Sequence, residues 1–97
     1  MWIRMTFSKI APADLDDARK LYSSAFVSGV IQSQPGYRFH YWLESAETVG
    51  DVISLTAWDS RDDAEAYERS GLYKELGSKF QEWFHTQRQL RSYEIRE

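Results

Sequence analysis

The sequence predicts an α+β fold in which four antiparallel strands form one sheet and helices cover one of its faces. Two observations lead to this prediction. Four segments have the composition or alternation of β-strands, and two amphipathic helical stretches separate the first from the second and the third from the fourth. The 97 residues suffice for one modest hydrophobic core, so we expect a single domain over residues 1–97.

The N-terminal third is predicted to contain one strand and one helix. Apolar and polar side chains alternate within residues 2–10, which indicates a half-buried strand. Pro12 ends the strand because proline cannot donate a ladder hydrogen bond. Asp14 is a favourable N-cap, and apolar side chains then recur at helical spacing from residue 15 to residue 31 or 32. The Pro35-Gly36 pair stops this helix.

The middle of the chain predicts an antiparallel hairpin. Residues 37–44 are rich in aromatic side chains, and residues 51–58 are mostly apolar and β-branched. The stretch of about six residues between them is polar and loop-like. Two such strands joined by a short loop favour a hairpin.

The C-terminal third is predicted to contain a broken helix and a last strand. Ser60 starts a capping box in which Asp63 replaces the usual glutamate. The helical spacing that follows is interrupted at Gly71 and resumes over residues 72–84. We therefore expect two short helices joined by a kink, followed by a strand over residues 89–95.

This order of elements, β-α-β-β-α(kinked)-β, is the split βαβ arrangement of ferredoxin-like folds. It places the helices on one face of the sheet and leaves the other face open. A second copy of the chain is the simplest cover, so we expect a homodimer through the open sheet face. Aromatic residues make up 15% of the sequence, more than one small core holds easily. Some of them should line a cavity or an interface.

Composition excludes several classes of function. The absence of cysteine excludes a disulfide scaffold, a thiolate metal site and a cysteine nucleophile. A net charge of −3 gives no electrostatic reason to expect nucleic acid as a partner. No apolar stretch is long enough to span a membrane, and the N-terminus lacks the layout of a signal peptide. We expect a cytoplasmic protein that does not bind membranes.

Four stretches of the sequence resemble the antibiotic biosynthesis monooxygenase-like (ABM) family. Residues 53–64 form an apolar strand that ends in Trp58, then a serine and acidic cap, then an amphipathic helix. Residues 34–37 resemble the family's turn into the second strand, residues 70–73 its helix kink, and residues 93–95 its last strand. The resemblance implies a dimeric α+β barrel, formed when two sheets meet face to face. It also implies a pocket between sheet and helices.

Members of this family include cofactor-free oxygenases of aromatic polyketides and quinols, haem-degrading enzymes, and proteins with no assigned activity. The haem-degrading branch uses an Asn, a Trp and a His, whose positions fall on Met5, Tyr67 and Gly77 here. None of the three matches, so the resemblance does not favour haem degradation. Glycine offers no axial ligand.

The candidate site consists of one histidine and four aromatic residues. His40 is the predicted general base or donor, because an unperturbed histidine titrates near ~6.5. The predicted walls of a substrate-binding pocket are Trp58, Tyr67, Tyr73 and Tyr22. Each has a plainer alternative: a strand histidine that faces water or the dimer partner, and aromatic side chains that only pack in the core.

The other charged residues are expected to lie on the surface and to take no part in catalysis or metal binding. Glu82 and His85 have the Glu-x-x-His spacing of di-iron sites, but only one copy is present, so no metal is expected. Arg88, Arg91 and Arg96 alternate with acidic residues and predict a solvated strand face. The sequence carries no phosphate loop or nucleotide fingerprint, so no cofactor is expected.

Two functional hypotheses follow. The first is a cofactor-independent monooxygenase that acts on a small aromatic or quinol-like substrate. In this chemistry a deprotonated, electron-rich substrate passes an electron to dioxygen, and the protein supplies an apolar pocket, a base and hydrogen-bond donors. The second is a non-catalytic dimer of the same fold that binds a small apolar or aromatic molecule. A haem-degrading monooxygenase is the third and weakest alternative.

Overall fold

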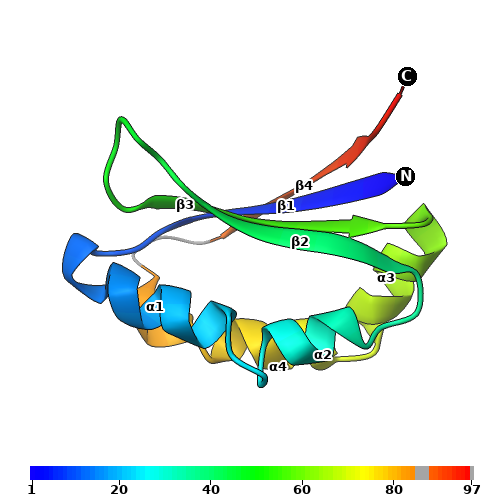
Figure 1. The fold of residues 1–97 in the computed structure, drawn as a ribbon, viewed down its shortest axis with the longest axis horizontal. Helices are drawn as coiled ribbons and strands as arrows, with labels where there is room; N and C mark the ends of the chain where they lie inside the picture. Colours follow the sequence, from blue (N-terminus) through cyan, green and yellow to red (C-terminus); the bar gives the residue numbers. More distant parts are fainter. Residues whose placement is uncertain (85–87, 97) are drawn as a thin grey trace.

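A computed structural model describes residues 1–84 and 88–96 and confirms the predicted α+β, ferredoxin-like architecture (Figure 1). In chain order the elements are β1 (Trp2–Lys9), η1 (Pro12–Asp14), α1 (Leu15–Tyr22), α2 (Ser28–Gln32), β2 (Tyr37–Glu44), β3 (Asp51–Trp58), α3 (Arg61–Arg69), α4 (Leu72–Ser78), η2 (Gln81–Trp83) and β4 (Gln89–Glu94). All four predicted strands are therefore present, with bounds within a residue or two of those expected.

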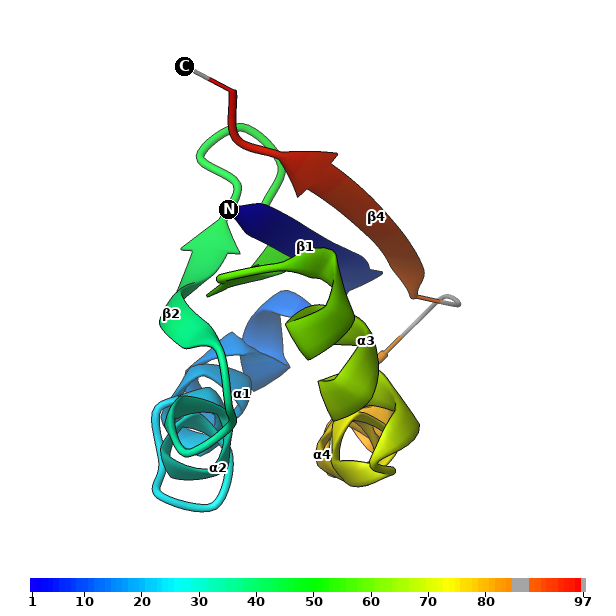
Figure 2. The ribbon, with the colours of Figure 1, turned by 90° about the vertical axis from the view of Figure 1, so that its right-hand side faces the viewer.

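The sheet has the strand order β2-β3-β1-β4, and every neighbouring pair is antiparallel. Figure 2 shows the helices on one side of the sheet as two separate pairs, α1 with α2 and α3 with α4. No other element of the described chain covers the opposite side. The space between the two helix pairs and the sheet is where the candidate site lies.

The two faces of the central strands differ in chemistry. In the β1–β3 register Arg4 lies opposite Thr56, and Thr6 lies opposite Ser54, so the middle of the face towards the helices is polar, with the core residues Trp58 and Val52 on either side of it. The residues between them, such as Met5 opposite Leu55, point to the open side and are apolar. Sheets that face water on one side usually place their apolar residues under the helices. Here the uncovered face is the apolar one.

The predicted single helix over residues 15–32 is wrong, because the structure has two helices, α1 and α2, with a turn at residues 23–27. The turn contains serines whose hydroxyl groups bond back to the preceding helical turn. Ser24 donates to the carbonyl of Leu21 at 2.6 Å, and Ser23 donates to the carbonyl of Arg19 at 3.1 Å. Such side-chain bonds compete with the helical ladder and favour its termination.

The caps and ends of the helices agree with the sequence at some positions and differ at others. Asp14 stands at the N-cap of α1, but its side chain makes no capping bond. Ser60 caps α3 as predicted, because its Oγ accepts from the backbone N–H of Asp63 at 3.2 Å. The predicted kink at Gly71 is confirmed, and its φ of 86° is a left-handed conformation that favours glycine. The second part of the broken helix is shorter than predicted, since α4 ends at Ser78.

A β-bulge changes which side the start of β2 faces. The register shifts between Tyr37, which lies opposite Trp58, and Phe39, which lies opposite Ala57. Simple alternation would place the Tyr37 side chain with Phe39 and Tyr41 on the open face. The bulge instead places it on the helix-facing side with His40, and the two side chains are hydrogen-bonded.

Within the described residues, no helix has the length and apolarity that crossing a membrane requires.

Candidate functional site

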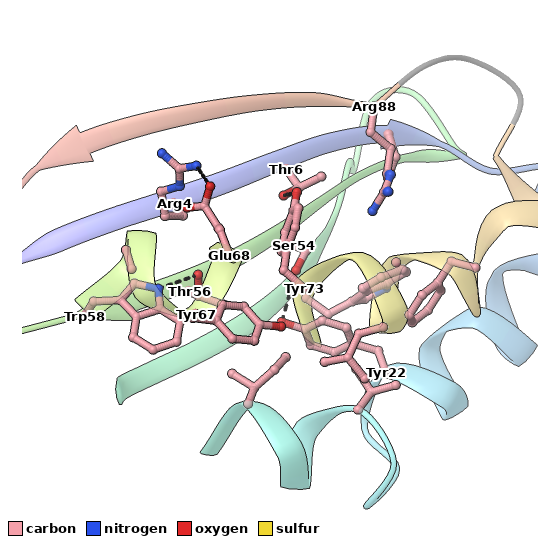
Figure 3. A pocket seen from close by; sticks show the side chains of 18 of the residues that line it. Arg4, Thr6, Tyr22, Ser54, Thr56, Trp58, Tyr67, Glu68, Tyr73 and Arg88 are labelled. Atoms are coloured by element: carbon pink, nitrogen blue, oxygen red, sulfur yellow. Dashed lines mark hydrogen bonds and ion pairs between the residues drawn. The ribbon is translucent and has the colours of Figure 1, made fainter. Parts of the chain in front are cut away.

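A cavity of about 70 Å³ lies between the helix-facing side of the sheet and the two helix pairs (Figure 3). One water molecule needs only ~15 Å³ by this measure, so the space is more than a packing defect. One wall is a row of hydroxyl groups on β1 and β3, from Thr6, Ser8, Ser54 and Thr56. The opposite walls are apolar side chains of the helices and of the segment before β4, including Val27, Ile31, Leu76, Phe80 and Phe84. A flat apolar ligand with polar edge atoms fits this division of chemistry.

Tyr22 reaches the cavity from α1, as the sequence predicts for a wall residue. Its hydroxyl donates to the carbonyl of Tyr41 and accepts from Ser54 Oγ, both at 3.3 Å. Burial of the side chain raises the pKa of Tyr22 to about 12. The phenol is therefore neutral near pH 7 and serves as a hydrogen-bonding group rather than as a base.

Trp58 and Tyr67 form a stacked pair at one end of the cavity. Trp58 is fully buried at the end of β3, and its Nε1 donates to Thr56 Oγ1 at 3.0 Å. The ring of Tyr67 lies over it with centroids 5.1 Å apart, and burial raises the pKa of this phenol above its ordinary value. The rings of Tyr67 and Tyr73 pack edge-on, with their centroids 6.0 Å apart.

Tyr73 completes the set of four predicted wall residues, since all four line the cavity. It comes from α4, and its hydroxyl lies 3.4 Å from Thr6 Oγ1 on β1. The phenol tip thus lies against the hydroxyl row of the sheet (Figure 3). The substrate-binding role of these four residues stays a prediction.

His40 is not among the residues that line this cavity. Its Nε2 lies 2.9 Å from Ser28 Oγ, and its Nδ1 lies 2.7 Å from the hydroxyl of Tyr37. Ser28 donates its own proton to the carbonyl of Tyr22, so the ring carries its proton on Nε2 and accepts from Tyr37 on Nδ1. Desolvation lowers the pKa of His40 and favours this neutral form. Both ring nitrogens of His40 are thus bonded and the ring lies outside the cavity, and its role as a base stays a prediction.

Sequence reasoning missed three charged residues in the lining, Arg4, Glu68 and Arg88. Arg4 on β1 and Glu68 on α3 form an ion pair, in which Arg4 Nη2 bonds to Glu68 Oε2. Arg4 also donates to Ser92 Oγ on β4. Glu68 Oε1 and Arg4 Nε have no partner among the described residues. The alternation of β1 carried a signal for Arg4, because it shares its parity with Thr6 and Ser8.

Arg88 corrects the prediction of a solvated arginine face at the C-terminus. Arg91 and Arg96 are exposed as expected, whereas Arg88 is half-buried and lines the cavity. Its guanidinium lies over the ring of Phe84 at 5.0 Å and near the ring of Tyr73 at 6.0 Å. No spacing in the sequence distinguishes it from the other two arginines.

Most of the residues that bear on metal or haem binding lie in the described part of the chain, but His85 does not. Residues 1–84 and 88–96 hold no group of three or more side chains suited to bind a metal ion. His85, the partner of Glu82 in the Glu-x-x-His pair, lies outside the described residues. At Gly77, where the haem-degrading branch has its histidine, the space is taken by the guanidinium of Arg88. A guanidinium has no lone pair to offer iron.

The fold is that of a small α+β protein with a cavity between sheet and helices. The model of the antibiotic biosynthesis monooxygenase family matches residues 1–86, and the chain belongs to this family. No curated protein matches the sequence.

Several solved structures have the same fold. A protein from Nitrosomonas europaea, named for the family, has a TM-score of 0.79 and 16% identity, covering 98% of each chain. One from Bordetella bronchiseptica has a TM-score of 0.83 and 14% identity, covering 97% of this chain and 95% of its own. SnoaB from Streptomyces nogalater, described as a cofactor-independent oxygenase, was solved as a mutant. Its TM-score is 0.72 at 15% identity, with 99% of this chain and 93% of its own covered. Identities this low establish the shared fold alone.

Proposed function

We propose that the protein is a cofactor-independent monooxygenase that acts on a small aromatic, quinol-like substrate in the cavity between sheet and helices. The observation that carries this proposal is the division of the cavity into a hydroxyl row on the sheet and apolar walls on the helices. Family membership supports it. A binding site for an electron-rich ring needs both features: apolar walls to hold the ring and donors for the oxygen atoms at its edge.

In the proposed reaction the substrate itself supplies the electrons. A phenol or anthrone loses a proton, and the resulting anion passes an electron to dioxygen. The substrate radical and superoxide then combine through a new C–O bond to a peroxide, which takes the proton back. Its O–O bond breaks with loss of water, which leaves one oxygen atom on the ring as a quinone carbonyl. The protein holds the ring against Tyr67 and Phe80 and keeps water away from it. Tyr73 presents its hydroxyl group to the substrate oxygens from the hydroxyl row, whereas Tyr22, whose hydroxyl is bonded to β2 and β3, forms part of the wall.

The proton acceptor in this proposal is Glu68 in place of His40. Glu68 is the one carboxylate in the described part of the cavity lining, and its Oε1 makes no other bond there. The O–H bond of a phenol, or the acidic ring C–H bond of an anthrone, breaks as the proton moves to that oxygen, while Arg4 holds Oε2. His40 becomes a positioning residue, because it ties β2 to the Ser28 start of α2.

The proposal includes a homodimer through the open sheet face. This face carries apolar side chains along β1 and β3, among them Phe7 and Leu55. On β2, Tyr41 and Leu43 are 58% and 40% exposed in the isolated chain. An apolar sheet face of this kind is a typical isologous interface. Light scattering at micromolar concentration is expected to give the mass of two chains, and a monomer would contradict this part of the proposal.

Oxygen uptake tests the activity. Purified protein, without added metal or flavin, is mixed with a panel of hydroquinones and anthrones, and each rate is compared with background autoxidation. We expect protein-dependent uptake that saturates with substrate and falls at least tenfold in Glu68→Gln. A matched control is Glu47→Gln, an exposed residue of the β2–β3 loop, which should leave the rate unchanged.

Two outcomes would replace the proposal. Saturable binding of the same compounds without uptake would favour the alternative, a non-catalytic dimer that binds a small aromatic molecule. That alternative has its own support, because the predicted base His40 has both ring nitrogens occupied. If the compounds cause no oxygen uptake and do not bind, the cavity is rejected as the functional site.

A further inference from the structure

We propose that Arg88 makes one end of the cavity an anion subsite, so that the ligand is an aromatic compound with a negatively charged oxygen group such as a carboxylate. The inference deepens the proposed function and rests on its choice of cavity, but it does not depend on turnover. It is carried by the position of the guanidinium, by the residues packed against it and by the charge of the lining.

The position of Arg88 depends on a glycine in α4. Gly77 is buried in the cavity wall, and a Cβ built on it would overlap Nη1 of Arg88 and lie 2.7 Å from Nη2. Glycine is unfavourable inside a helix, so packing of α4 alone would favour a larger residue here. It leaves room for a guanidinium group to lie directly against the helix backbone.

Two aromatic rings hold the guanidinium in that position. The ring centroid of Phe84 lies 5.0 Å from the central guanidinium carbon of Arg88, and that of Tyr73 lies 6.0 Å from the same atom. Cation–π contacts of this kind engage the flat face of the guanidinium. The N–H groups point outward in the plane of the group, and they match the two oxygens of a carboxylate.

The charges in the lining do not balance without a ligand. The described lining holds Arg4, Glu68 and Arg88 as its charged residues, and the first two pair with each other. No carboxylate of the described residues lies within ion-pair distance of Arg88. A half-buried cation beside apolar walls attracts an anion strongly, because little solvent screens it.

The arrangement also gives the ligand an orientation. Figure 3 shows Arg88 at one end of the hydroxyl row and the Arg4–Glu68 pair at the other. The phenols of Tyr22 and Tyr67 between these ends are neutral, because burial raises the pKa of both. A bound aromatic anion therefore places its charge at Arg88 and its remaining polar atoms towards Tyr73 and Glu68.

Titration calorimetry with two probes of the same shape tests this subsite. The probes are 2-naphthoate and its neutral counterpart 2-naphthamide, each titrated into the full-length protein at pH 7.5 and low salt. We expect naphthoate to bind at least tenfold more tightly than the amide. In Arg88→Gln the affinity for naphthoate should fall at least tenfold, while that for the amide changes less than twofold.

Three further variants separate this role from general effects. Arg69→Gln removes the same charge from an exposed position on α3 and should leave both affinities unchanged. Arg88→Lys should restore part of the preference for naphthoate. Gly77→Ala keeps the charge but displaces the guanidinium, so it should reduce naphthoate binding selectively.

The outcomes distinguish this inference from the proposed function. Equal binding of the two probes by the native protein, an equal loss of both in Arg88→Gln, or no binding of either would overturn the anion subsite. A clear preference for naphthoate that Arg88→Gln removes would support it, even if no hydroquinone or anthrone gives oxygen uptake. In that case the subsite stands and the oxygenase proposal fails.

Discussion

The two faces of the sheet contrast in a way that separates ligand binding from assembly. The helix-facing side carries polar side chains on β1 and β3, such as Thr6 and Thr56, although it is covered. The open side carries apolar ones, such as Met5 and Leu55, although nothing in the described chain covers it. A sheet optimised for an isolated subunit would have apolar residues in the middle of the covered face and polar ones on the open face. The polar face is instead suited to a ligand and the apolar face to a second copy.

The largest expected effect comes from charging the open face. Leu55 on β3 points away from the cavity because its neighbours Ser54 and Thr56 line it. Leu55→Asp would place a carboxylate in the proposed apolar interface, where a buried unpaired charge is strongly unfavourable. Sedimentation velocity should show the mass of one chain for the variant and of two chains for the native protein.

Val49→Asp is the matched control for this experiment, since Val49 is 65% exposed in the β2–β3 loop. It should remain dimeric. If Leu55→Asp also remains dimeric, the open face does not form the interface, and the contrast between the two faces would need another explanation.

The next largest effect concerns the covered side. Trp58 is fully buried and stacks on Tyr67, so Trp58→Ala should lower the free energy of unfolding by about 3–5 kcal/mol. Urea denaturation followed by circular dichroism measures this loss. A loss below about 1 kcal/mol would show that the side chain is not part of the core. Trp58→Phe, which keeps a stacked ring, should recover much of the stability.

Most of the fold was predictable because its signals are local. The alternation of β1, the hairpin composition of β2 and β3 and the glycine at the α3–α4 kink each act within a few residues. The break between α1 and α2 was missed because the apolar spacing continues across residues 23–27. What ends the helix is a set of serine hydroxyl bonds to helical carbonyls, and spacing alone does not reveal these.

The site was predicted only in part, for a different reason. The four aromatic wall residues lie on regular elements whose inward faces follow from periodicity. The hydrogen bonds of His40 depend on a bulge that turns Tyr37 to its side of β2 and on Ser28 after the helix break, and neither is visible in the spacing. Arg88 reaches the cavity because Gly77 is close in space, although eleven positions separate them in the sequence. Pairings of this kind are invisible without the fold.

A smaller effect is expected from the hydroxyl row. Thr56→Val keeps the shape of the side chain but leaves the buried Nε1 of Trp58 without its acceptor. The free energy of unfolding should fall by about 1–3 kcal/mol, the usual cost of an unsatisfied buried donor. Thr6→Val is the comparison, because its bond to Tyr73 is long at 3.4 Å, and it should cost less than about 1 kcal/mol. Equal losses in both variants would contradict this ranking.

The smallest effect is a pH dependence of stability that originates in His40. Burial lowers the pKa of this imidazole in the folded protein, whereas the unfolded chain titrates near ~6.5. Between the two values the unfolded chain binds more protons, so the free energy of unfolding decreases as pH falls below about 6.5. His40 should therefore contribute full stability above that pH and progressively less below it, as the ring loses its acceptor for Tyr37.

His40→Gln tests this by removing the titration while keeping a neutral polar side chain. Urea unfolding at pH 7.5, 6.5 and 5.5 should give a flatter dependence for the variant than for the native protein. The carboxylates Glu44 and Glu65, whose pKa values are lowered by arginine partners, take up protons only below about pH 4.5. They are present in both the variant and the native protein, so they do not affect the comparison. Parallel curves would mean that His40 is not held neutral by Ser28 and Tyr37. A fall in oxygen uptake without any loss of stability would instead return this histidine to the catalytic site.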